Sequence, residues 1–191
     1  VNPEDQSRSL LLGSEPRVVV RRTSEQHNTV IYGSPTLHGG DLTDPEMLDR
    51  LARAPIVFLP QLDGEFVVTI ETDNFIHMGS DRFSSHPIFY SVDKDKLVIS
   101  FEYQSMWNWL SQQNKLVPDS AAFYEFLHFQ RLFHETTLDR KSKFLPPATL
   151  LTINKSTGKS ESKRYWLPSF EKRDEDREEI CALPHETIEG G

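Results

Sequence analysis

The stretch from Leu62 to Glu102, LDGEFVVTIETDNFIHMGSDRFSSHPIFYSVDKDKLVISFE, decides the fold. It contains four short runs of β-branched and aromatic residues, at 66–70, 75–78, 87–90 and 96–100. Clusters of Asp, Asn, Gly and Ser separate consecutive runs, as turns between strands do. The pattern predicts an antiparallel meander within an α+β domain.

Further strands are expected on both sides of this stretch. Residues 17–22 and 29–32 are rich in valine and isoleucine, and the turn-forming segment between them predicts a hairpin. Residues 149–153 form another apolar run, and 159–166 are its expected partner across a turn. The chain therefore supplies more strands than one meander needs.

Three amphipathic helices are predicted, at 44–53, 102–111 and 118–129. Asp44 is placed to cap the first helix, and Pro45 follows at the first helical position, where its missing N–H does no harm. The residues of the third helix that we expect to face inward are Ala122, Phe123, Phe126 and Leu127. On this pattern the second and third helices cover one face of a sheet.

The amino-acid composition argues against two classes of binding partner. The chain has 191 residues, long enough for a packed core, and its 21 basic residues stand against 29 acidic ones, a net charge of −8. No basic cluster occurs, so neither nucleic acid nor an anionic membrane is an expected partner. The single cysteine, Cys181, excludes an internal disulfide, and a cytoplasmic location is the simplest expectation.

The chain divides into three expected parts. Residues 1–9 are polar and lack any hydrophobic period, so we expect a mobile arm, and 10–170 form the domain. Residues 171–191 contain three basic and eight acidic residues, which gives this tail a charge of −5. Such a composition predicts a solvated tail or a linker toward a further domain.

Several motifs carry a resemblance to a known family. They are the segments LDGEF at 62–66, SDRFSSHPIFY at 80–90, LPPATLLT at 145–152 and RYW at 164–166. In this order they resemble the N-terminal class II glutamine amidotransferase domain of the asparagine synthetase family, whose corresponding motifs read L-[ND]-G-x-F, R-D-R-F-G-x-x-P and LPPG. The resemblance spans residues 43–166. It implies an Ntn-like four-layer αββα sandwich of two antiparallel sheets, with the predicted helices in the outer layers.

The resemblance also shows what this chain lacks for glutamine hydrolysis. In the family the nucleophile is a cysteine at the first residue, and its own α-amino group serves as the base. Val1 offers no nucleophile, and Ser9, in a segment similar to the family's opening motif, is internal. Cys181 has acidic neighbours that disfavour a thiolate, so it is expected to be inert. We therefore predict no catalytic residue in this chain.

The family's glutamine-binding residues are only partly matched. Asp44 stands where the family has a substrate-binding aspartate, twenty positions before Gly64, although its setting also fits a helix cap. Asn28 matches the first residue of the family's N-G-E-I-Y-N segment, but the glycine and glutamate that follow are replaced. The arginine of the family's R-G-P-D segment has no counterpart. Asp44 and Asn28 are thus predicted as vestigial ligands, and Gly64, Asp81 and Arg82 as structural motif residues, with Asp81 and Arg82 holding the turn through a charged hydrogen bond.

Other chemistry is not expected. Ser85 and His86 are adjacent in sequence, but neighbours in an extended chain point to opposite faces, which argues against a hydrolase pair. His128 and His134 do not have the spacing of metal ligands, so we predict no metal site. The chain contains no glycine-rich phosphate loop. ATP and Mg²⁺ are therefore expected only for a synthetase domain outside these residues.

Three hypotheses follow. The first is a degenerate amidotransferase-like domain that serves as a scaffold or docking domain for an amide-forming synthetase, present in cis or in trans. The second is an active glutaminase whose N-terminal cysteine is missing from this sequence. The third is a stand-alone, non-enzymatic binding protein. A homodimer is a further expected assembly.

Overall fold

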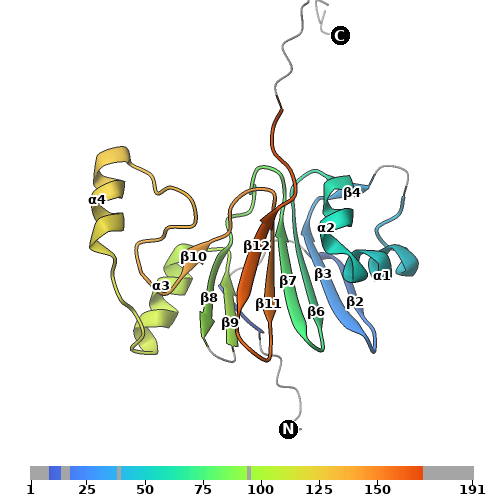
Figure 1. Ribbon diagram of the computed structural model, residues 1–191, viewed down its shortest axis with the longest axis horizontal. Coiled ribbons are helices and arrows are strands. Elements are labelled where there is room, and N and C mark those ends of the chain that lie inside the picture. The colour runs from blue at the N-terminus through green and yellow to red at the C-terminus, as the bar shows by residue number, and fades with distance from the viewer. Residues whose placement is uncertain (1–8, 14–17, 38–39, 94–95, 170–191) are drawn as a thin grey trace, which may run out of the picture.

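The computed structural model describes residues 9–13, 18–37, 40–93 and 96–169. A six-stranded antiparallel sheet with strand order β12-β11-β7-β6-β3-β2 forms its larger half (Figure 1). The strands are β2 (Val18–Thr23), β3 (His27–Gly33), β6 (Phe66–Thr72), β7 (Phe75–Ser80), β11 (Thr149–Asn154) and β12 (Ser160–Arg164). The predicted hairpins are confirmed, because β2 pairs antiparallel with β3, and β11 with β12.

The second sheet is four-stranded, with the order β1-β9-β8-β10. Its strands are β1 (Ser9–Leu12), β8 (Phe89–Asp93), β9 (Lys96–Ser100) and β10 (Lys143–Phe144). One pair departs from the predicted antiparallel pattern, because β1 runs parallel to β9. The long connection between these strands, unlike a short hairpin turn, leaves their relative direction free. A two-stranded sheet of β4 (Thr36–Leu37) and β5 (Leu62–Asp63) completes the strands.

The predicted single meander is wrong at its centre. β6 and β7 form one hairpin and β8 and β9 another, but the two hairpins lie in different sheets. The segment 81–88 crosses from one sheet to the other instead of closing a turn. The second edge of β7 pairs with β11, a strand about seventy residues further along the chain, and a local pattern of alternation cannot reveal such a partner.

Helices cover the outer faces of the sheets. α1 (Pro45–Arg53), the short α2 (Pro55–Phe58) and the 3₁₀ turn η1 (Leu59–Gln61) pack on the six-stranded sheet in one apolar cluster, and α3 (Tyr103–Gln112) packs on the four-stranded sheet. A separate cluster fills the space between the sheets. The order helix, sheet, sheet, helix confirms the predicted α+β sandwich.

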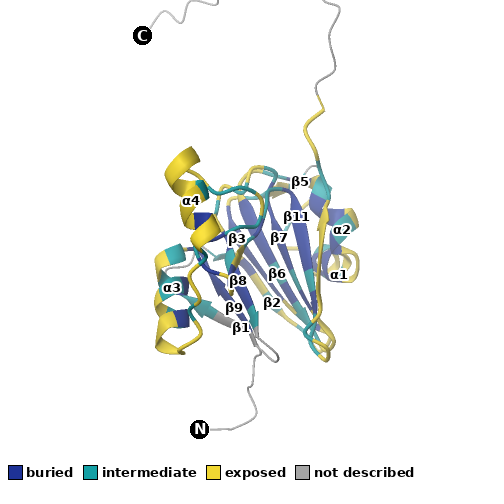
Figure 2. Cartoon of the chain, turned by 60° about the vertical axis from the view of Figure 1, so that its left-hand side comes forward, coloured by how far each residue is buried: buried dark blue, intermediate teal, exposed yellow. Residues whose placement is uncertain are grey.

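The helix α4 (Ser120–Phe129) begins as predicted, with the Asp119 side chain accepting a hydrogen bond from Ala121 N at 3.0 Å. Its predicted inward face is wrong. Only Ala122 is buried, whereas Phe123, Phe126 and Leu127 are exposed, and the helix projects from the body of the domain (Figures 1 and 2). Backbone hydrogen bonds join the residues just before the helix to residues 138–140 and not to a sheet. The apolar side chains of the helix therefore have no sheet to pack against.

The expected arm and tail lie largely outside the described residues. Ser9 begins β1, whereas 1–8 and 170–191 belong to the part of the chain that is not described. The domain limits of 10 and 170 therefore stay a prediction. Within the described ranges, no helix is long and apolar enough to cross a lipid bilayer.

Candidate functional site

The motif segments come together where β7 ends. Asp81, which is almost fully buried, is the centre of this region. Its carboxylate accepts hydrogen bonds from the backbone N–H groups of Phe66 at 3.3 Å, Phe83 at 2.8 Å and Ser85 at 3.0 Å, and from the Ser85 hydroxyl at 3.2 Å. One side chain therefore joins the start of β6 to the crossing segment.

Arg82 connects the same turn to the β5 segment. Its guanidinium donates to the Asp63 carboxylate and to the Pro60 carbonyl, the latter at 3.0 Å. It also lies 5.7 Å from the centre of the Trp166 ring, a cation–π distance. The charged hydrogen bond predicted for Asp81 and Arg82 does not join these two neighbours, because Arg82 pairs with the Asp63 carboxylate. Asp81 holds the turn through backbone N–H groups instead.

The segments LPPATLLT and RYW both contact the chain where β7 ends, at Ser80 and Asp81. The Ser80 hydroxyl donates to the Pro146 carbonyl at 2.7 Å, and the Tyr165 hydroxyl donates to the Ser80 carbonyl at 2.6 Å. Ala148 N donates to the Asp81 carbonyl at 2.8 Å. Burial, and then the charge of Asp81, raises the pKa of Tyr165, so this phenol stays protonated as a donor. We call the set Asp63, Ser80, Asp81, Arg82, Pro146, Ala148, Tyr165 and Trp166 the motif junction.

Two residues of the motif segments adopt a backbone conformation that usually belongs to glycine, although neither is a glycine in this chain. Ser84 has φ 55° and Ala148 has φ 51°, both in the left-handed region that favours glycine. These are the two positions at which the resembling family has glycine, in R-D-R-F-G and in LPPG. Gly64 of the LDG segment has φ 85°, and a Cβ there would lie 2.6 Å from the Ser34 carbonyl oxygen.

A cavity of about 380 Å³ opens between the two sheets. Asn28 lines it, with Arg21 and Glu71 from the six-stranded sheet and Leu11 from β1. The Asn28 side chain accepts a hydrogen bond from the Thr23 hydroxyl at 3.2 Å, and Glu71 pairs with Lys155 at 2.7 Å. We call this the inter-sheet cavity.

Asp44 lies elsewhere. It is the N-cap of α1, where its carboxylate accepts from Glu46 N at 3.0 Å, and α1 packs on the outer face of the six-stranded sheet. Asn28 faces the inner side of the same sheet. The described geometry therefore separates the two predicted glutamine ligands, whose binding role stays a prediction.

A histidine network that sequence reasoning missed joins β3 to α1. His27 is buried, with Nδ1 at 2.9 Å from the Thr29 hydroxyl and Nε2 at 2.9 Å from Asp49 Oδ1. Arg22 Nε donates to the same carboxylate oxygen at 3.1 Å. Thr29 is fully buried, whereas the Arg22 and Asp49 side chains are partly exposed, so the network runs from the buried face of β3 to the surface beside α1. The alternation that puts His27 and Thr29 on one face of a strand was the available signal.

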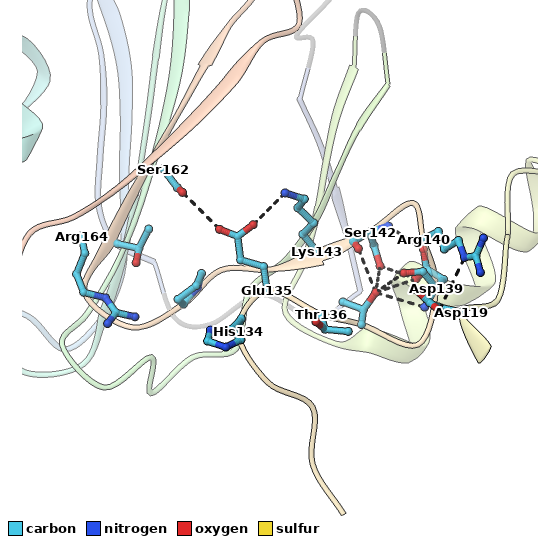
Figure 3. A pocket seen from close by; sticks show the side chains of 13 residues that line it. Asp119, His134, Glu135, Thr136, Asp139, Arg140, Ser142, Lys143, Ser162 and Arg164 are labelled. Atoms are coloured by element: carbon cyan, nitrogen blue, oxygen red, sulfur yellow. Dashed lines mark hydrogen bonds and ion pairs between the residues drawn. The ribbon is translucent and has the colours of Figure 1, made fainter. Parts of the chain in front are cut away.

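A pocket of about 640 Å³ lies beside the segment 134–143 and is shown in Figure 3. Asp139 is buried at its edge and accepts hydrogen bonds from the Ser142 hydroxyl at 2.5 Å, Ser142 N at 2.7 Å and the Tyr103 hydroxyl at 2.9 Å. The Glu135 carboxylate pairs with Lys143 at 2.9 Å. These acidic groups are already paired with protein groups, which leaves them no evident role toward a ligand.

Hydrolase and metal chemistry find no support in the described ranges. The Ser85 hydroxyl donates to Asp81 and not to His86, whose Nε2 is buried without a hydrogen-bond partner among the described residues. His134 lines the large pocket and His128 contacts the ring of Phe129. No group of three or more His, Cys, Asp or Glu residues suited to a metal ion occurs in the part of the chain that the structure describes.

Comparison with known proteins gives little further guidance. No family model matches the sequence, and no curated protein matches it. Among solved structures, glutamine phosphoribosylpyrophosphate amidotransferase from B. subtilis, complexed with ADP and GMP, aligns with a TM-score of 0.43 and 14% identity over 81% of this chain. The alignment covers 32% of that chain, so the present sequence spans about a third of its length. At this level of similarity the match assigns no family.

Proposed function

We propose that this chain is a glutamine amidotransferase-like domain of an asparagine synthetase-related, ATP-dependent system that forms amide bonds. On this proposal it hydrolyses no glutamine itself and serves as a scaffold or docking domain. The observation that carries the proposal is the motif junction, at which four sequence segments separated by up to a hundred residues meet through side-chain and backbone contacts.

The left-handed residues strengthen the assignment. For a residue with a Cβ, the left-handed conformation costs about 1–2 kcal/mol. Ser84 and Ala148 adopt it at the places where the family has glycine, so both segments follow the turn geometry that glycine favours although this chain has lost the glycine. A chance match of short motifs gives no reason for this coincidence.

The separated ligands support the lack of glutaminase activity. Glutamine would need groups for its amino and carboxylate ends in one cavity, but Asp44 caps a helix on the outer face of the sheet while Asn28 faces the inter-sheet cavity. Ser9 lies within a strand and follows eight residues in the sequence, so its nitrogen is part of a peptide bond and is no free base. The partner expected from this reading is a cytoplasmic synthetase domain that supplies the ATP and Mg²⁺ chemistry.

A glutaminase assay on two proteins tests the proposal. The 191-residue chain is expected to release no glutamate above background. A variant trimmed to begin at residue 9 and carrying Ser9→Cys would have both a thiol and a free amine, and it should still be inactive because the pocket is not assembled. Circular dichroism on both proteins checks that the fold survives the trimming.

Activity in either protein would contradict the proposal in a distinct way. Hydrolysis by the trimmed Ser9→Cys variant, abolished by a thiol-reactive glutamine analogue, would show that the pocket exists and that only the nucleophile is missing. Hydrolysis by the 191-residue chain itself would refute the scaffold role. For docking, the expected result is co-purification with an ATP-dependent synthetase from the source cell, and binding to that synthetase when the two purified proteins are mixed.

A further inference from the structure

The surface of α4 is apolar on almost every side. Five large side chains are exposed on it: Phe123, Tyr124, Phe126, Leu127 and Phe129. Tyr124 and Leu127 are each 74% exposed, and Phe129 is 55% exposed. A helix that is apolar all round is normally buried in a folded assembly, and a contiguous exposed apolar patch marks an interaction site. We call these five residues the α4 surface.

An apolar hollow adjoins the α4 surface. It has a volume of about 360 Å³, and Phe126, Phe89, Phe144 and Leu132 contribute to its walls. Phe126 belongs both to the hollow and to the α4 surface, so the protruding side chains and the hollow form one continuous face. A surface that carries a protrusion beside a recess can pair with a copy of itself about a two-fold axis.

The charges around α4 indicate which partner fits. The only Asp, Glu, Lys or Arg in α4 is Glu125, and its carboxylate is engaged by Phe133 N at 2.7 Å. The nearby Arg131 guanidinium lies 4.5 Å from the centre of the Phe133 ring. The α4 surface therefore offers a charged partner no obvious counter-ion, and it brings no like-charge repulsion when it meets itself, although the chain as a whole is acidic.

We propose that a second copy of this chain docks on the α4 surface and forms an isologous dimer. The inference stands independently of the proposed function. From the exposed fractions and an area of about 150–250 Å² for an aromatic side chain, the surface offers roughly 550 Å² per copy. If both copies buried these side chains completely, the interface would cover at most about 1,100 Å², close to the roughly 1,000 Å² expected of a specific interface. The dimer is accordingly expected to be reversible, with a micromolar dissociation constant.

Sedimentation velocity of the 191-residue chain, from about 1 to 200 µM, tests the proposal. A concentration-dependent monomer–dimer equilibrium is expected. Leu127→Asp should raise the dissociation constant at least tenfold, because it removes a buried leucine and places a charge in an apolar interface. Tyr124→Lys, on the same surface, should do the same. The matched control is Val57→Asp on α2, where the valine is 64% exposed and outside the α4 surface, and it should leave the equilibrium unchanged.

Thermal melts of all variants confirm folding before the association is compared. A wild-type chain that stays monomeric throughout the range would overturn the proposal. So would a dimer that persists equally in Leu127→Asp and Tyr124→Lys, or one that Val57→Asp disrupts as strongly.

Discussion

Replacing Asp81 with asparagine tests whether one carboxylate holds the motif junction together. The residue is 1% exposed; Oδ1 accepts three hydrogen bonds and Oδ2 accepts two, with Ser85 N shared between the two oxygens. Asparagine keeps the shape but replaces one acceptor oxygen with an NH₂ donor. If that group occupies the Oδ2 position, Phe66 N loses its acceptor and faces another donor, the new NH₂ group lacks an acceptor there, and Ser85 N keeps only its longer bond to Oδ1, at 3.3 Å.

The magnitude follows from these contacts. Each buried group left without a hydrogen bond costs about 1–3 kcal/mol. Asp81→Asn should therefore lower the free energy of unfolding by roughly 3 kcal/mol, out of the 5–15 kcal/mol typical of a domain. For a chain of this length that corresponds to a fall in melting temperature of about 6–12 °C. The fold itself should survive, because the apolar clusters between and outside the sheets remain intact.

Urea unfolding followed by tryptophan fluorescence measures this loss. Trp166 lies beside Arg82 in the junction, so its emission also reports local loosening. The control is Asp73→Asn in the exposed turn between β6 and β7, which makes the same chemical change where no hydrogen bond is at stake among the described contacts. A loss below about 0.5 kcal/mol in Asp81→Asn, or an equal loss in the control, would refute the role assigned to this carboxylate.

Three further predictions follow, two on backbone strain and one on pH. Gly64→Ala should destabilise the fold by about 2 kcal/mol or more in the same urea assay, because the added Cβ would meet the Ser34 carbonyl oxygen at a φ that disfavours it. Ser84→Gly should be neutral or stabilising by up to about 1 kcal/mol, and a clear loss there would contradict the strain argument. The hydrogen bond from His27, aided by Arg22, lowers the pKa of Asp49. A lowered folded-state pKa stabilises the protein at pH values above the carboxyl's ordinary pKa, and this contribution is lost as the pH falls through the folded value. The urea midpoints of wild type and Asp49→Asn should therefore differ at about pH 6 and converge as the pH falls through the lowered pKa of Asp49; a difference that stays constant with pH would exclude this linkage.

Local sequence patterns correctly predicted those elements whose structure depends on residues close together in the sequence. The helix at 44–53 has the cap and the proline that its sequence specifies, and the two outer hairpins follow from alternation and turn residues. The assignment of hairpins to sheets was not accessible in this way. β7 pairs with β11, about seventy residues further along the chain, and the sequence of neither segment identifies the other as its partner.

Three features of the site and the surface were wrongly predicted or missed for the same reason. The apolar residues of α4 predicted a buried face, because a sequence records that a helix is apolar and does not record what covers it. The network of His27 with Asp49 joins residues from a strand and a helix, and only the packing of α1 on the sheet brings them within 2.9 Å. Arg82 similarly finds Asp63 across the junction rather than its sequence neighbour. Tertiary contacts decided each of these outcomes.

Substitutions at the junction and in the inter-sheet cavity are expected to differ in their cost to stability. At the junction, Asp81 satisfies buried backbone donors, so its loss costs stability directly. In the inter-sheet cavity, Arg21 and Asn28 are exposed, and water can replace the contacts that such side chains make. Side chains that line the cavity can therefore be exchanged at little cost to folding. On the function proposed above, this difference would allow the fold to persist while the residues that bind a ligand change.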